Sequence, residues 1–323
     1  MSLRKLAEIA FLVVVPLAIF LLLTEVVLRV YLRNHIFYDV EMSRYALALK
    51  IDSPDPRIGH HHRPGAEARL MGVTIRTNAD GFRDDEYPVA RTGSRRVMFL
   101  GDSLTLGWGV EKEATFEHRL EQQLSRERPT EVINLGVGNY NTTQEVYLFL
   151  EKGLRYRPDQ VVLFYFINDA EPVPQRSRFP GLGRTRVVTF FWSRIKALIS
   201  QLSDAPGYRE FYSALYSEDS PGWARSRESL TLLSEVARAE GFDLRVVLLP
   251  ELHQLDPYAF EREHAMVRDF VRALGVPVLD LAPAFRGEDP QSLWVSLDDA
   301  HPNARAHGLI ADYTRDFLLE SGP

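Results

Sequence analysis

The chain has 323 residues, of which 45% are hydrophobic, 11% aromatic and 25% charged. This ordinary globular composition argues against a disordered, collagen-like or polytopic membrane protein. The formal net charge of −6 lacks the basic footprint of a protein that binds nucleic acid, so no nucleic-acid partner is expected. The absence of cysteine excludes disulfides, thiolate nucleophiles, iron–sulfur clusters and cysteine-type zinc sites.

The N-terminal segment is apolar without interruption from Ile9 to Leu23, and nearly so from Leu6 to Leu28. The longer range is enough to cross a bilayer core, for which about 20 residues suffice. A cleaved signal peptide is the alternative, but a cleavage site has small residues after the apolar core, and Val, Val, Leu and Arg occupy positions 26–29. We therefore expect residues 1–33 to form an uncleaved transmembrane anchor.

The orientation of this anchor is harder to predict, because Arg4 and Lys5 before the apolar segment are matched by Arg29 and Arg33 after it. The very short N-terminal tail favours an orientation with the rest of the chain outside the cytoplasm. The expected location is the plasma (inner) membrane, with a single pass and a periplasmic or extracytoplasmic domain.

Residues 34–95 are rich in turn signals, with prolines at positions 54, 56, 64 and 88. Two β-type runs, Ala66 to Leu70 and Val73 to Thr77, flank Met71-Gly72 and predict a hairpin. We interpret this region as a small β extension rather than a second domain.

From residue 96 to residue 323, short apolar runs typical of β-strands alternate with stretches of helical spacing. The predicted strands are Val97–Leu100, Glu131–Leu135, Gln160–Phe166, Leu244–Leu249 and Val276–Leu281. Continuous apolar strands that alternate with amphipathic helices predict an α/β domain, with a parallel sheet of about five strands covered on both faces. Sites in such sheets form at the carboxyl ends of the strands.

Residues 170–222 interrupt this alternation. Seven basic residues stand between Pro172 and Arg209 against the single Asp204, and apolar residues recur there at helical spacing from Val188 to Leu202. One interpretation is an insertion or lid that meets lipid headgroups or an anionic polymer. The alternative is a helix packed on the domain with a solvated basic face.

The first chemical signal is Ser103, which follows the predicted strand Val97–Leu100 after Gly101 and Asp102. A serine at this position leaves the carboxyl edge of the sheet with its hydroxyl and its own N–H facing the crevice. That placement suits a nucleophile whose amide also helps to stabilise an oxyanion. An ordinary strand-to-helix turn would have the same sequence.

The second signal is the segment Asp298-Asp299-Ala300-His301-Pro302-Asn303. Pro302 is favoured as a first helical residue, which would put His301 at the helix boundary and Asp298 on the approaching loop. A carboxylate there can hold the imidazole Nδ1–H and leave Nε2 free to take a hydroxyl proton. The alternatives are a surface turn and a metal site made by Asp298, Asp299 and His301.

Two further blocks offer oxyanion donors. Asn168 follows the predicted strand Gln160–Phe166, and its side-chain amide can stabilise an oxyanion. The segment 134–139, Asn-Leu-Gly-Val-Gly-Asn, follows the strand before it, and its Gly and Asn residues permit a backbone that directs amides at an anion. Turn chemistry alone would explain either block.

The chain from about Arg96 to Leu319 resembles the SGNH/GDSL hydrolases, a family named for Ser, Gly, Asn and His in four separate blocks. The matches are Gly101-Asp102-Ser103-Leu104, Asn168-Asp169 and Asp298-x-x-His301. The resemblance implies a flavodoxin-like α/β/α fold and an ester-cleaving serine mechanism without metal or cofactor, with Ser103, His301 and Asp298 in the catalytic roles.

The second block of the family departs from its pattern, because Asn139 stands near the expected oxyanion glycine and Gly138 just before it. The donor would be a backbone N–H, so either residue can serve beside the Ser103 amide and the Asn168 side chain. Phe166 also replaces a glycine that is common two residues before the asparagine.

The anchor, the extension with Asn78-Ala79-Asp80-Gly81-Phe82-Arg83 and the domain together resemble membrane-anchored bacterial members. Some such relatives act on acyl groups of envelope or exported polysaccharides. We therefore expect a serine esterase that hydrolyses an acyl ester, with an O-acetyl ester on a polysaccharide as a candidate substrate. The alternatives are an O-acyltransferase that uses the same serine and a non-catalytic, membrane-tethered polysaccharide-binding protein.

Overall fold

The computed structural model describes residues 3–31, 36–173, 190–191, 194–195 and 207–320. The chain divides into two compact units, one made of Met1–Leu47 with Ser177–Ala205 and the other of Ala48–Arg176 with Pro206–Pro323. Most of the insertion expected at residues 170–222 lies outside the described residues.

The first unit contains the N-terminal helix α1 (Leu3–Tyr31) and most of α2 (Tyr38–Leu49). Within α1, the 21 residues Phe11–Tyr31 have a mean hydropathy of 2.8 and none of the apolar stretch is buried in the protein. This helix is long and apolar enough to cross a membrane, which a signal sequence would be as well. The prediction of an apolar N-terminal helix is confirmed.

The second unit is built on five parallel strands in the order β6-β5-β7-β8-β9. These strands are β5 (Arg95–Leu100), β6 (Thr130–Asn134), β7 (Gln160–Tyr165), β8 (Asp243–Leu248) and β9 (Val278–Asp280). Every predicted strand is present within two or three residues of its expected ends. From β5 the chain adds β6 on one side of the sheet and then β7, β8 and β9 on the other side. The carboxyl ends of β5 and β7 therefore flank the switch point where α/β proteins form their sites.

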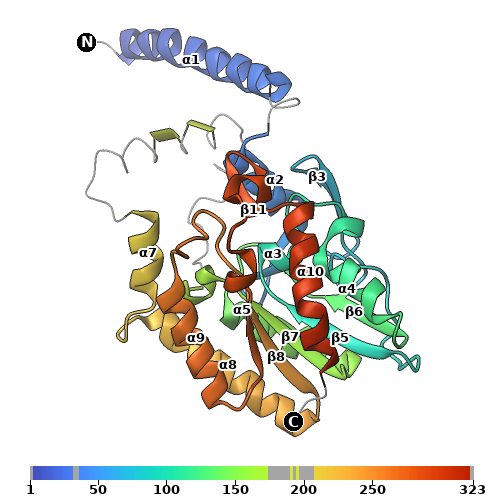
Figure 1. The fold of residues 1–323 in the computed structure, drawn as a ribbon. Coiled ribbons are helices and arrows are strands. Elements are labelled where there is room, and N and C mark those ends of the chain that lie inside the picture. The colour runs from blue at the N-terminus through green and yellow to red at the C-terminus, as the bar shows by residue number, and fades with distance from the viewer. Residues whose placement is uncertain (1–2, 32–35, 174–189, 192–193, 196–206, 321–323) are drawn as a thin grey trace. The chain divides into compact units, whose positions relative to one another are not determined.

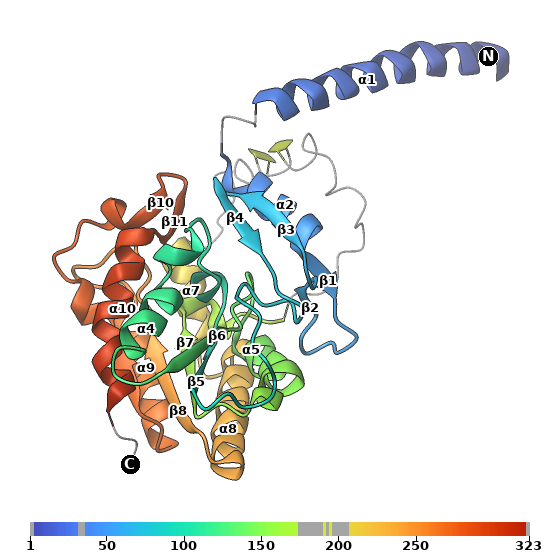
Figure 2. The same cartoon turned by 90° about the vertical axis from the view of Figure 1, so that its right-hand side faces the viewer.

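Helices cover both faces of this sheet (Figures 1 and 2). On one face α4 packs with α10, and on the other α5 packs with α8, whose Trp223 contacts Phe270 of α9. The helices are α3 (Ser103–Leu106), α4 (Phe116–Leu124), α5 (Thr142–Leu148), α7 (Tyr208–Leu215), α8 (Pro221–Glu240), α9 (Glu261–Ala273) and α10 (Ala304–Leu319). The three-layer α/β/α fold is therefore confirmed.

Single turns of tighter or wider helix connect these elements. They are η1 (Lys112–Ala114), η2 (Phe149–Gly153), η3 (Leu154–Tyr156), η4 (Ile167–Ala170), η6 (Ala282–Phe285) and η7 (Pro290–Leu293). Among them η4 directly follows the carboxyl end of β7, and it carries Asn168.

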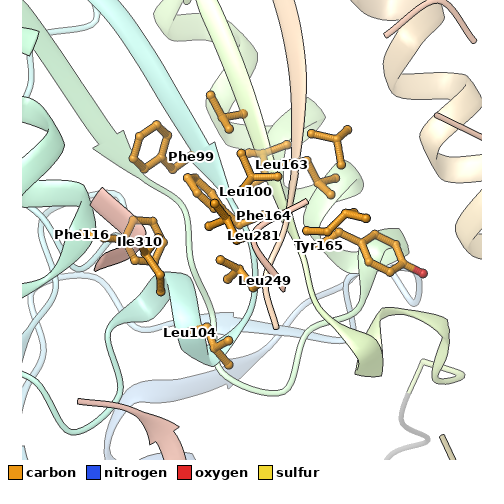
Figure 3. Packing of buried hydrophobic residues seen from close by; sticks show 14 of the residues in the cluster. Phe99, Leu100, Leu104, Phe116, Leu163, Phe164, Tyr165, Leu249, Leu281 and Ile310 are labelled. Carbon is orange, nitrogen blue, oxygen red and sulfur yellow. The ribbon is translucent and has the colours of Figure 1, made fainter. Parts of the chain in front are cut away.

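An aromatic core supports the carboxyl edge of the sheet (Figure 3). The Phe164 ring lies 4.8 Å from that of Phe99 and 4.6 Å from that of Phe116, and all three side chains are fully buried. Removing one such ring typically costs about 3–5 kcal/mol. Leu100 and Leu104, which bracket the turn that holds Ser103, are buried in the same cluster, so this turn has a rigid base.

Three small antiparallel pairs complete the unit: β1 (Lys50–Asp52) with β2 (His60–His62), β3 (Glu67–Leu70) with β4 (Val73–Arg76), and β10 (Trp294–Ser296) with β11 (Asp299–Pro302). The β3–β4 pair is the predicted hairpin. Its two-residue turn has positive φ at both Met71 (50°) and Gly72 (81°), the backbone that joins twisted strands most closely.

Candidate active site

Ser103 begins helix α3 three residues after the end of β5. A side chain at Gly101 would meet the Thr105 hydroxyl at 2.0 Å, so only glycine lets α3 fold back this tightly. Asp102 caps the helix, because its Oδ1 accepts a hydrogen bond from the Leu104 N–H at 2.9 Å. The hydroxyl of Ser103 is thus presented at the sheet edge, and the side chain is 6% exposed.

The Ser103 hydroxyl donates to the imidazole of His301, with 2.8 Å between Oγ and Nε2. The other imidazole nitrogen, Nδ1, lies 2.5 Å from Oδ1 of Asp299. The same carboxylate oxygen accepts the His301 backbone N–H at 3.1 Å. Two distant stretches of the chain therefore bring a hydroxyl, an imidazole and a carboxylate into one line of hydrogen bonds.

The carboxylate that holds His301 is Asp299, so the expectation for Asp298 is wrong. Residues 299–302 form strand β11, in which side chains two residues apart share a face. Asp299 and His301 have this spacing, whereas Asp298 precedes the strand and is exposed. The prediction treated the segment as a loop, where a separation of three residues would have been acceptable.

The same misinterpretation affects Pro302, which is the last residue of β11 and not the first of a helix. Helix α10 begins at Ala304, and Asn303 is its N-cap. The Asn303 side chain accepts hydrogen bonds from the N–H groups of Arg305 and Ala306 at 3.0 and 3.1 Å. A strong capping side chain one residue later therefore determines where the helix starts.

Trp108 supplies a third hydrogen bond to Asp299, since its indole Nε1 donates to Oδ2 at 2.9 Å. Burial by itself would raise the pKa of the Asp299 carboxyl, but the hydrogen bond and charge of His301, together with the Trp108 hydrogen bond, hold that pKa below its usual value. Asp299 is therefore an ionised, nearly inaccessible partner that fixes the orientation of the His301 ring.

Trp108 was not predicted from the sequence. Its only signal was the pattern Gly107-Trp108-Gly109 a few residues after Ser103, with both glycines in the left-handed region at φ of 75° and 73°. Buried Arg83 supports this loop by donating hydrogen bonds to the carbonyls of Leu106, Gly107 and Val110 at 2.9, 2.6 and 2.6 Å.

Asn168 lies beside Ser103, because both contact the same oxygen of Asp102. The Asn168 Nδ2 donates to Asp102 Oδ2 at 2.9 Å, and the Ser103 Oγ lies 3.4 Å from that oxygen. A carboxylate only accepts, so the contact orients the amide with its NH₂ group toward Asp102 and Ser103. One Nδ2 hydrogen is used in this way, and the second meets no acceptor among the described residues.

The loop after β6 packs directly on α3. A side chain at Gly136 would meet the Leu106 backbone nitrogen at 2.3 Å, so glycine is required for this close approach. The Asn134 side-chain amide stabilises the same approach, because it accepts a hydrogen bond from the Gly136 N–H at 2.7 Å and donates one to the Thr105 carbonyl at 2.8 Å. Residues 137–139, which follow, are thereby held beside Gly101 and Thr105, on either side of Ser103.

Gly138 and Asn139 form the tip of this loop. The Tyr140 N–H closes a turn on the Val137 carbonyl at 3.2 Å, and the Val137 N–H bonds to the Gly101 carbonyl at 3.2 Å. Asn139 has a φ of 64°, in the region where asparagine is tolerated best after glycine. Among the described residues, no hydrogen bond uses the Asn139 N–H.

The metal alternative has no support in the described part of the chain. Across those residues, no group of three or more histidine, aspartate and glutamate side chains is arranged to hold a metal ion. Of the proposed ligands, Asp299 and His301 bond to each other, and Asp298 is exposed.

Hydrolases on several unrelated folds use a serine, a histidine and an aspartate in such a line of hydrogen bonds. The GDSL-like lipase/acylhydrolase family matches residues 99–309, which include Ser103, Asn168 and His301. The chain belongs to this family and is an ester-hydrolysing enzyme. No curated protein matches it.

Similar solved structures include a member of the lipolytic protein G-D-S-L family from Veillonella parvula DSM 2008, with 14% identity and a TM-score of 0.44 over 71% of this chain and 100% of that one. A two-domain esterase active on acetylated mannans has 17% identity and a TM-score of 0.45 over 71% and 51% of the two chains. The psychrotrophic esterase EstA from Pseudoalteromonas sp. has 14% identity and a TM-score of 0.42 over 70% and 97%.

Proposed function

We propose that the protein is a serine esterase in which Ser103 is the nucleophile, His301 the general base and Asp299 the residue that orients His301. The observation that carries this proposal is the unbroken pair of contacts, 2.8 Å from Ser103 Oγ to His301 Nε2 and 2.5 Å from His301 Nδ1 to Asp299 Oδ1. In this mechanism Ser103 Oγ bonds to the ester carbonyl carbon while its proton passes to Nε2.

The tetrahedral intermediate then loses its alcohol, which takes the proton back from His301. Water, deprotonated by the same histidine, attacks the acyl-enzyme and releases the carboxylic acid together with the free Ser103 hydroxyl. Neither step needs a group beyond the substrate, water and these side chains.

Three donors would hold the oxyanion: the Ser103 N–H, the second Nδ2 hydrogen of Asn168, and the Asn139 N–H. Of Asn139 and Gly138, Asn139 is preferred because it stands near the position where the family resemblance expects the oxyanion glycine, and no backbone acceptor among the described residues takes its N–H. A residue with a side chain can take this role, since the donor is on the backbone and Asn139 adopts the required left-handed conformation.

The test is the variant Ser103→Ala with a short aryl ester as substrate. Turnover should fall by about 10⁴-fold or more, because the nucleophile and the base act as one unit. A serine-directed phosphonate should label the unmodified protein and leave the variant unlabelled. Full activity or full labelling in the variant would overturn the mechanism, and a failure of the unmodified protein to react would favour a pure binding protein.

For the substrate and location, we propose an acyl ester, such as an O-acetyl group on an envelope or exported polysaccharide, met outside the cytoplasm by an enzyme anchored through α1. The resemblance to membrane-anchored relatives and the exposed apolar stretch Phe11–Tyr31 support this proposal. Release of acetate from an acetylated polysaccharide tests the substrate, and transfer of the acyl group to an added sugar acceptor would instead indicate an acyltransferase. Resistance of the catalytic unit to external protease in spheroplasts would contradict the location.

A further inference from the structure

The half-buried side chain of Lys50 lies against the Gly138–Asn139 turn. Its Nζ donates to the Gly138 carbonyl at 2.7 Å and lies 3.0 Å from Oδ1 of Asn139. Lys50 is the first residue of β1, in the extension that precedes the family match at residues 99–309. A residue from outside the matched region therefore contacts the loop proposed to hold the oxyanion.

The β1–β2 pair braces the same turn. Lys50 pairs with His62, and His60 on β2 places its Nε2 3.3 Å from the Gly138 carbonyl oxygen. The Tyr140 hydroxyl donates to the His60 carbonyl, and the rings of Tyr140 and His60 lie 5.1 Å apart. This small sheet lies beside α5 (Figure 2), whose Gln144 bonds to the Ile58 carbonyl at 2.8 Å, so Lys50 is held from several sides.

The geometry of the peptide bond links Lys50 to the proposed donor. In a trans peptide the C=O and N–H groups point in opposite directions, so the Asn139 N–H points away from the cation that holds the Gly138 oxygen. A hydrogen bond from an ammonium group to the carbonyl is charge-assisted, and it polarises the peptide so that its N–H becomes a stronger donor. The second contact, to Asn139 Oδ1, helps to hold this residue at its positive φ.

We propose that Lys50 is a positioning residue of the oxyanion hole, an inference that rests on the proposed function. Lys50 holds and polarises the Gly138–Asn139 peptide, so that the Asn139 N–H is directed at the developing negative charge. Lys50 touches neither the substrate nor the Ser103 hydroxyl in this role. It acts through one peptide bond, and the chain before the matched domain thus contributes to catalysis.

The charges around Lys50 agree with this role. Burial lowers the pKa of Lys50 to about 7 and the pKa of both His60 and His62 to about 3. Between about pH 3 and pH 7, Lys50 therefore carries its charge while the two histidines are neutral and do not repel it. His61, the middle residue of β2, faces the His62 carbonyl and Lys152.

The test is Lys50→Met, which keeps the length of the buried stem and removes the donors and the charge. The matched control is Lys152→Met, because Lys152 is a partly buried lysine of the same region that bonds to the Asp80 carbonyl at 3.0 Å and not to the turn. For a short aryl ester, we expect kcat to fall about 10- to 100-fold in K50M with KM within twofold, and both constants to stay within about twofold in K152M. The rate of labelling by the phosphonate should fall in parallel with kcat.

A purely structural role would lower the melting temperature of K50M without changing kcat in the folded fraction, and that result would overturn the proposal. An equal loss in K152M would do the same. If K50M does not fold, Lys50→Gln, whose NH₂ group can still donate but carries no charge, should show a smaller loss of kcat, and unchanged kcat in K50Q would also overturn the proposal. Loss of activity in S103A with full activity in K50M would reject the role of Lys50 alone, whereas an active S103A would reject the proposed function itself.

Discussion

The strongest consequence of the site geometry is that two adjacent aspartates should behave in opposite ways. Asp299→Asn changes the side chain that contacts His301 at two points and Trp108 at a third. Each of these three N–H groups donates a hydrogen bond to the carboxylate. An amide has only one acceptor oxygen, so its NH₂ group must face either the Trp108 N–H or the two His301 donors, and in the second arrangement the imidazole takes the wrong tautomer.

The size of the effect follows from the charge that Asp299 provides. When Ser103 transfers its proton, His301 becomes a cation whose centre lies about 4 Å from that of the carboxylate, and at an effective dielectric constant of ~20 this attraction is worth about 4 kcal/mol. That free energy corresponds to about a 10³-fold change in rate. With the tautomer error included, kcat for Asp299→Asn should fall by about 10³- to 10⁴-fold.

The assay is steady-state hydrolysis of a short aryl ester by Asp299→Asn and Asp298→Asn, with circular dichroism to establish that both fold. Asp298 is exposed and follows the strand β10 at its turn, so its variant should keep kcat within about threefold. An inactive Asp298→Asn beside an active Asp299→Asn would refute the reasoning from strand geometry and restore the spacing that the sequence suggested.

Two further predictions concern buried groups near the site. Trp108→Phe removes the indole donor to Asp299 and keeps most of the ring, so kcat should fall about 10-fold, and an unchanged kcat would show that the other two contacts suffice. Glu117 in the first turn of α4 is 4% exposed, and burial raises the pKa of its carboxyl to about 8. The Glu117 carboxyl ionises near pH 4.5 in the unfolded chain but stays protonated up to about pH 8 in the folded protein. The free energy of unfolding therefore decreases as the pH rises from about 4.5 toward 8, by about 1.4 kcal/mol per unit of pKa difference. Glu117→Gln does not titrate, so its advantage in melting temperature should be larger at pH 9 than at pH 5, and a constant difference would contradict the burial of a neutral carboxyl.

The central sheet could be predicted from the sequence because its strands are buried on both faces. In β7 all six residues are buried, and in β5 five of six are, so a continuous apolar run with no competing period marks each strand. The strand ends then placed Ser103 and Asn168 at one edge without any contact information. The pattern that gave the fold also gave the positions of these two side chains.

The choice between Asp298 and Asp299 could not be made in the same way. Strands β10 and β11 have three and four residues, and their pairing is irregular between Trp294 and Ser296. Such short strands leave no period in the sequence, and a local reading of Asp-Asp-Ala-His-Pro-Asn finds only turn and cap signals. Which carboxylate faces His301 depends on whether the backbone is extended, and this is decided by pairing with another segment.

Trp108 and Lys50 were not predicted because their roles exist only in long-range contacts. Trp108 meets Asp299 from 191 residues away, and Lys50 meets Gly138 from 88 residues away. A buried tryptophan between glycines, or a lysine at the start of a three-residue strand, is equally compatible with simple packing. Hydrogen-bond partners at such separations are a property of the tertiary fold.

These contacts connect residues 48–95 to the loops around the candidate site, although the family match begins only at residue 99. Arg83 holds the loop that carries Trp108 through three carbonyl groups, and Asp84 accepts the Asn134 N–H at 2.8 Å at the end of β6. Lys50 bonds to the Gly138 carbonyl in the loop that follows. A chain cut just before β5 would leave those buried carbonyl and amide groups without partners beside the site, so the boundary set by sequence similarity is not the boundary of the unit that positions Ser103 and its donors.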